Sequence, residues 1–132
     1  MKPQLHVFAG SFPSRDDACL YTEAQWEREP DDSVSDEDFA AWEDRNPTWA
    51  FRNELGDIYL DADFIETIDG QTRYDYLSTY LINDGDLQTA KNAAPNANVL
   101  LLLFHEALGG IAAELHSTKQ MIYCGAFDFR WP

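Results

Sequence analysis

Hydrophobic and polar residues alternate or cluster in three stretches of the chain that predict β-strands. Residues 4–9 are rich in apolar side chains and end at a Gly-Ser-Phe-Pro turn, which predicts a short strand. Residues 98–104 form a continuous apolar run between turn-forming residues, as expected of a central strand buried on both faces. Residues 119–129 alternate with a period of two, so every second side chain is predicted to lie on one face of a third strand. One of its faces is predicted to hold Met121, Tyr123, Gly125, Phe127 and Phe129.

Helical signals fall between these strands. A serine followed three residues later by an acid resembles a helix-capping box, and this pattern begins at Ser14 and again at Ser35. The first pattern predicts a helix over residues 15–26. The second predicts a short helix that stops before Pro47.

Two further helices are predicted from apolar residues with the spacing i, i+3, i+7. One covers residues 72–82, and the other is capped by Asp86 and closed by Pro95. Residues 56–69 are different, because the alternation in their first half favours an extended segment. Residues 63–68 fit either a strand or a helical turn.

The order strand, helices, extended segment, helices, strands is typical of an α+β domain. We therefore predict helices packed on a small, mainly antiparallel sheet. The chain has 132 residues, which fits a single domain spanning residues 1–132. Its 45% hydrophobic and 14% aromatic content argues against intrinsic disorder in spite of the high charge.

The formal net charge of −15 disfavours several classes of function. Direct binding to DNA or RNA, or to an anionic membrane, would bring together surfaces of the same sign. Residues 15–69 hold 18 of the 24 acids and four of the nine bases, together with Trp26, Trp42 and Trp49. This acidic segment fits either a solvated face that keeps the protein soluble or an interface for a basic partner. The tryptophans fit a core as well as an interface, and their mixture with acids favours the interface.

No residue pattern points to catalysis, a metal site or a cofactor, and we predict that the protein is not an enzyme. The three histidines lack the spacing of a zinc protease, and the acids of residues 57–66 lack the glycine and the ligand spacing of a calcium loop. Cys19 and Cys124 fit two buried thiols better than a disulfide. The longest apolar run has six residues, too few to span a membrane, and the first residues lack a secretory signal, so we expect a cytoplasmic protein.

Four short segments occur in the order and spacing of a known family. They are Leu-His-Val-Phe-Ala-Gly-Ser-Phe at residues 5–12 with the acidic helix after it, Leu-Asp-Ala-Asp-Phe-Ile-Glu at residues 60–66, the apolar strand at residues 98–104, and Tyr-Cys-Gly-Ala-Phe-Asp-Phe at residues 123–129. In these segments the chain resembles the bacterial immunity protein 22 family. The acidic residues 27–49 lie outside the family pattern.

The resemblance implies an α+β cytoplasmic protein that protects a bacterial cell by binding a polymorphic toxin domain, and it implies no catalytic residues. Many antibacterial toxins are basic nucleases, so an acidic inhibitor can occupy the surface that holds the nucleic acid. Acids that flank aromatic residues are the predicted contacts with such a toxin. These contacts are Trp26, Asp36, Glu37, Trp42, Glu43 and Asp44.

Two other functions fit the same sequence. One is an acidic nucleic-acid mimic that binds several DNA-binding proteins of the host. The other is a small hydrolase that uses carboxylates together with His105 or His116 in a cleft. The mimic predicts several basic partners, and the hydrolase predicts stabilisation by a divalent metal.

Overall fold

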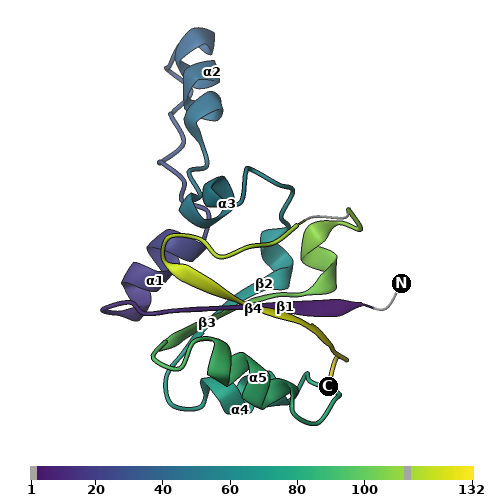
Figure 1. Cartoon of the computed structure of the whole chain (residues 1–132). Helices are drawn as coiled ribbons and strands as arrows, with labels where there is room; N and C mark the ends of the chain where they lie inside the picture. Colours follow the sequence, from purple (N-terminus) through teal and green to yellow (C-terminus); the bar gives the residue numbers. More distant parts are fainter. Residues whose placement is uncertain (1–2, 112–113) are drawn as a thin grey trace.

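Across residues 3–111 and 114–132, which the computed structural model describes, four strands form one antiparallel sheet (Figure 1). The strands are β1 (Gln4–Gly10), β2 (Ile65–Asp69), β3 (Val99–Leu103) and β4 (Met121–Asp128). They lie in the order β2-β3-β1-β4, and each pair of neighbours is antiparallel. The predicted antiparallel sheet is therefore confirmed, as are the strands predicted at residues 4–9, 98–104 and 119–129.

Helices cover both faces of the sheet (Figure 1). They are α1 (Arg15–Thr22), α3 (Ala50–Glu54), α4 (Arg73–Ser78), α5 (Asp86–Ala93) and the 3-10 helices η1 (Ala62–Phe64) and η2 (His105–Leu108). A first apolar cluster joins α4 and α5 to one face, and a second joins α1, α3 and η2 to the other. The α+β fold class is confirmed. None of the described helices is long and apolar enough to cross a membrane.

The capping signals at Ser14 and Ser35 are confirmed. Each serine side chain accepts a hydrogen bond from the backbone N–H three residues further on, so each satisfies a donor that the first helical turn leaves free. The first helix is shorter than predicted and ends at Thr22. Its extension is prevented because the next residues turn into an extended backbone in which Gln25 pairs with Thr48.

Two other helical predictions need correction. α5 begins at Asp86 itself, and Gly85 occupies the capping position with a φ of +90°, a conformation that glycine adopts without steric cost. The helix predicted over residues 72–82 is shorter, and only α4 forms there. Residues 63–68, which fitted either a strand or a helical turn, contain the end of a 3-10 helix followed by a strand. The Asp61 side chain accepts the N–H of Asp63 and begins η1, and β2 follows directly.

β3 is the central strand that its apolar run predicts. All five of its residues are buried. Leu100 and Leu102 belong to the cluster under α4 and α5, whereas Val99, Leu101 and Leu103 belong to the cluster under α1 and α3. Burial on both faces explains why this strand has no polar alternation.

The single face predicted for residues 121–129 is wrong, because a β-bulge divides β4. Val7 of β1 lies opposite Gly125, whereas the next residue, Phe8, lies opposite Tyr123, so Cys124 is an extra residue in β4. Gly125 has a φ of +128°, which few other residues adopt. Met121 and Tyr123 consequently face α1 and α3, whereas Phe127 and Phe129 face α4 and α5.

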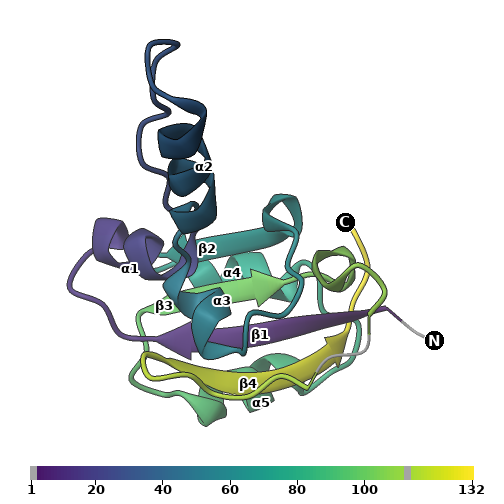
Figure 2. The same ribbon diagram turned by 90° about the horizontal axis from the view of Figure 1, so that it is seen from above.

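Residues 26–47, which we call the arm, extend away from the sheet between α1 and α3 (Figures 1 and 2). The arm contains α2 (Asp36–Arg45) and an irregular segment that leads to it. At the base of the arm, the backbones of Gln25 and Thr48 exchange two hydrogen bonds with N–O distances of 2.7 and 2.9 Å. We call the other described residues the body.

Candidate functional site

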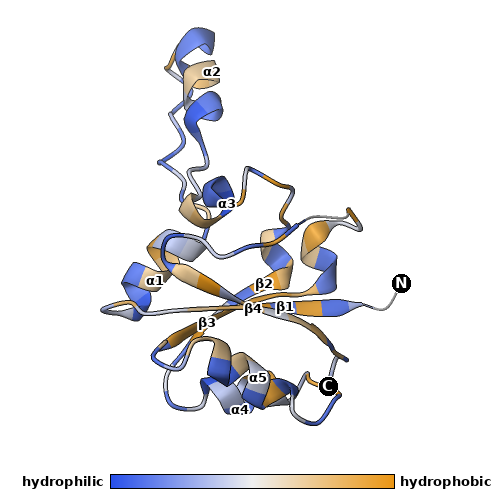
Figure 3. Ribbon diagram, in the orientation of Figure 1, coloured by the Kyte–Doolittle hydropathy of each residue, from blue (hydrophilic) through white to orange (hydrophobic). Residues whose placement is uncertain are grey.

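The arm concentrates negative charge on a segment that has no core. Nine acids and two arginines occur within its 22 residues. The helix α2 is described throughout, and none of its residues is buried. Figure 3 shows the same contrast, with apolar residues gathered in the sheet and its covering helices and mainly hydrophilic residues along the arm. The arm therefore exposes most of its surface to solvent.

All six predicted contact residues lie on the arm. Asp36 and Glu37 are in the first turn of α2, and Glu43 and Asp44 are near its end. Residues seven apart lie on the same side of a helix, about 10 Å apart along its axis. These four exposed acids therefore flank one side of α2, where the small, exposed Ala40 separates them.

The two aromatic contact residues are close to each other. Trp26 and Trp42 pack with ring centroids 6.0 Å apart, and Phe39 packs on Trp42 at 5.6 Å. The indole of Trp42 is half-buried, whereas Trp26 is 63% exposed. The pair thus forms the apolar contact within the arm, and Trp26 still presents a large apolar area to solvent.

Trp49 has a different role from the other two tryptophans of the acidic segment. Its indole N–H donates a hydrogen bond of 2.7 Å to the backbone carbonyl of Thr22, and its ring packs against the cluster under α1 and α3. Of the three tryptophans that fitted either a core or an interface, Trp49 therefore packs against the core, whereas an interface role of Trp26 and Trp42 stays a prediction. Trp49 supports the body, whereas Trp26 and Trp42 belong to the arm.

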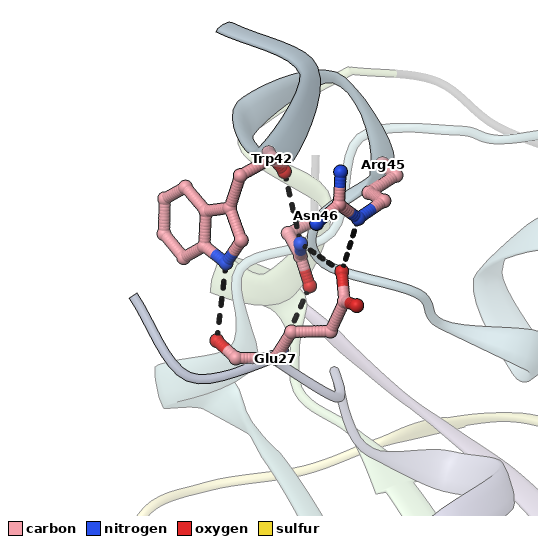
Figure 4. A network of polar contacts seen from close by, with 4 residues as sticks. All are labelled: Glu27, Trp42, Arg45 and Asn46. Carbon is pink, nitrogen blue, oxygen red and sulfur yellow. Dashed lines mark hydrogen bonds and ion pairs between the residues drawn. The ribbon is translucent and has the colours of Figure 1, made fainter. Parts of the chain in front are cut away.

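Glu27 connects the segment that leaves the body with the end of α2 (Figure 4). Its carboxylate accepts hydrogen bonds from Arg45 at 2.6 Å and from the Asn46 amide at 2.7 Å. Its backbone N–H donates to Asn46 at 2.8 Å, and its carbonyl accepts the indole N–H of Trp42 at 3.3 Å. The hydrogen bonds from Asn46 and Arg45 lower the pKa of the Glu27 carboxyl, because they favour its ionised form.

Sequence reasoning missed this network. Arg45 in the last turn of a helix is a recognisable favourable charge. Its partner Glu27 is 18 residues earlier in an irregular segment, and no periodic pattern relates the two positions.

Two hollows lie at the base of the arm. One, of about 340 Å³, is lined by Trp26, Glu27 and Arg45 together with Gln25 and Thr48 at the base. The other, of about 490 Å³, shares Gln25 and Thr48 and extends towards α1 and α3. A partner on the arm would therefore meet a concave surface between the arm and the body.

Two side chains of the body with shifted pKa values, His6 and Tyr76, are each hydrogen-bonded to another side chain of the body. The ring of His6 lies 2.9 Å from the Tyr123 hydroxyl, and burial together with the nearby His105 lowers its pKa. The Tyr76 hydroxyl donates to Glu66 and contacts the Tyr80 hydroxyl at 2.9 Å, and its pKa is raised by burial and by the nearby Glu66. The His6 contact joins β1 to β4, and the Glu66 contact joins β2 to α4.

No group of three or more potential metal ligands occurs within residues 3–111 and 114–132. His105 is the first residue of η2, and the exposed His116 contacts the backbone carbonyl of Ser117 at 2.9 Å. Cys19 and Cys124 are free thiols, but only Cys124 is buried as predicted, and Cys19 is partly exposed. Desolvation raises the pKa of both thiols.

Comparison with family models, with curated proteins and with solved structures found no match to this chain. The resemblance to the immunity protein 22 family therefore stays a prediction.

Proposed function

We propose that this protein is an immunity protein that binds and neutralises a cognate antibacterial toxin domain, with the arm as its contact surface. One observation supports this proposal above the others: acids and exposed aromatic surface are concentrated on a projecting segment without buried residues in its helix. Ordering such a segment costs conformational entropy that burial does not offset. A solubilising charge needs no such arrangement, because acids spread over the body would serve equally well.

The chemistry of the arm favours a cationic partner. Exposed carboxylates speed the approach of a positively charged surface, and desolvated aromatic side chains supply much of the affinity of protein interfaces. On this proposal the acids of α2 meet the basic cleft of a nuclease, and Trp26 packs at its rim. Inhibition then requires no catalysis, metal or cofactor, and the complex forms in the cytoplasm of the protected cell.

Calorimetry with the toxin domain encoded beside the gene of this protein tests the proposal. We expect a one-to-one complex of about nanomolar affinity, the range of tight complexes. The affinity should fall as the salt concentration rises, because exposed charges are screened.

Other outcomes would contradict the proposal. Similar weak affinities for several unrelated DNA-binding proteins would instead indicate the nucleic-acid mimic. A rise in melting temperature with Mg²⁺, Mn²⁺, Ca²⁺ or Zn²⁺, without toxin binding, would favour the hydrolase.

A further inference from the structure

The arm has few contacts of its own to keep it folded. α2 has ten residues, and isolated helices shorter than about 12–15 residues are marginal in water. Among its described residues, the aromatic contacts are those of Trp42 with Trp26 and Phe39. At its base, the Gln25–Thr48 pair closes the arm without burying α2. Small polar contributions therefore decide whether the arm is ordered.

Glu27 is the centre of those polar contributions. Its four hydrogen bonds reach Trp42 and Arg45 in α2 and Asn46 just beyond it. Asn46 also donates a hydrogen bond of 2.9 Å to the backbone carbonyl of Trp42. Within the described chain, every hydrogen bond that links residues 26–34 to α2 or Asn46 has Glu27 as one partner. The backbone and the carboxylate of a single residue thus join both halves of the arm, with two hydrogen bonds each.

We propose that Glu27 is the positioning residue that keeps the arm folded, and that the arm opens as a unit while the body remains intact. The exposed ion pair with Arg45 is a weak interaction by itself. It is effective here because the same carboxylate oxygen also accepts the Asn46 amide, and because the helix that it supports has no core.

The consequence for binding rests on the function proposed above. A partner that meets a folded arm does not have to order it, whereas a partner that meets an open arm must offset that cost. Glu27 is thereby assigned a role in affinity even if its side chain never touches the toxin.

Hydrogen–deuterium exchange on the free, full-length protein tests the proposal directly. In Glu27→Ala we expect exchange of the α2 amides to rise about tenfold, as local opening becomes easier, while amides of β1 and β3 keep their wild-type rates. Glu29→Ala is the matched control. It removes one acid from the same segment, and Glu29 makes no hydrogen bond or ion pair within the described residues.

Two results would overturn the proposal. In one, Glu27→Ala leaves the exchange of α2 unchanged, which would show that the network does not order the arm. In the other, β1 and β3 exchange faster by the same factor as α2, which would show that arm and body unfold together.

A second readout uses the Trp26–Trp42 pair, whose closeness should produce an exciton couplet in circular dichroism. Glu27→Ala should weaken the couplet, because it removes both hydrogen bonds of the carboxylate and leaves only those of the Glu27 backbone. Glu27→Gln should keep part of it, because an amide oxygen still accepts the Asn46 hydrogen bond but forms no ion pair with Arg45. Trp42→Phe identifies the signal, since it removes one member of the pair. An unchanged couplet in Glu27→Ala would contradict the proposal.

The two proposals fail in different ways. If the wild-type protein does not bind the toxin, the proposed function is wrong, and the exchange experiment still decides the role of Glu27. If the wild type binds but Glu27→Ala has wild-type affinity and exchange, only the role of Glu27 is wrong.

Discussion

The body and the arm are held together by different physical means. The body has a central strand, β3, whose residues are all buried, and it is covered by helices on both faces of the sheet. The arm has a helix without buried residues and depends on an aromatic contact and the Glu27 network. We therefore expect the body to supply most of the free energy of folding, and the arm to contribute exposed charge and little stability.

The largest expected effect is in the core of the body. Leu101 is fully buried in β3, so Leu101→Ala should lower the free energy of unfolding by about 3 kcal/mol, through lost burial and the cavity left behind. Phe39→Ala should change it by less than about 0.5 kcal/mol, because Phe39 contacts Trp42 within the arm and the arm opens without unfolding the body. Urea unfolding followed by circular dichroism measures both. Equal losses would mean that the arm and the body form one cooperative unit.

The charges of the arm should control how fast a partner binds. We expect the triple variant Asp36→Asn, Glu37→Gln, Asp44→Asn to slow association with the toxin about tenfold at low salt, within the range of electrostatic steering. The matched control, Asp75→Asn, Asp84→Asn, Glu114→Gln, removes the same charge from exposed acids of the body. Stopped-flow mixing measures the rates. If both variants slow association equally, net charge matters and the arm has no special role.

Removing the arm should have little effect on the body. Gln25 and Thr48 already form an antiparallel pair, so an Asn-Gly turn can join them in place of residues 26–47. The shortened protein should keep its free energy of unfolding within about 1 kcal/mol and should no longer bind the toxin. Urea unfolding and calorimetry test the two parts. Loss of the folded body would show that the arm contributes to the core.

The sequence predicts those features that depend on neighbouring residues. Capping by Ser14 and Ser35 needs only a short local pattern, and the burial of β3 follows from its apolar run. The placement of all six candidate contacts on one segment follows from the concentration of acids and tryptophans. Such signals are contained in windows of a few residues.

Features that depend on contacts between residues far apart in the sequence cannot be predicted from such short windows. The bulge at Cys124 exists only because β1 lies beside β4, so the regular alternation of residues 119–129 gives no sign of it. Glu27 looks like one acid among many until the arm brings it to Arg45 and Asn46. The different environments of the tryptophans also depend on distant residues, because Trp49 is held by a hydrogen bond to the backbone carbonyl of Thr22.

The smallest expected effect is the response of the arm to pH. The folded-state pKa of Glu27 lies below its usual value of 4.5, so the stabilisation from its ionised form is complete above about pH 4.5 and is lost as the pH falls through the lowered pKa. The Trp26–Trp42 couplet of the wild type should weaken in that acidic range. Glu27→Gln should have a weaker couplet at neutral pH and a flatter response.

Asp31→Asn is the control for this titration. Hydrogen bonds from Ser33 also lower the pKa of Asp31, but within the described residues Asp31 makes no hydrogen bond to either tryptophan of the pair. Its substitution should therefore leave the acid response of the couplet unchanged. If Asp31→Asn removed the response and Glu27→Gln did not, the acid sensitivity of the arm would lie in the turn before α2 rather than in the Glu27 network.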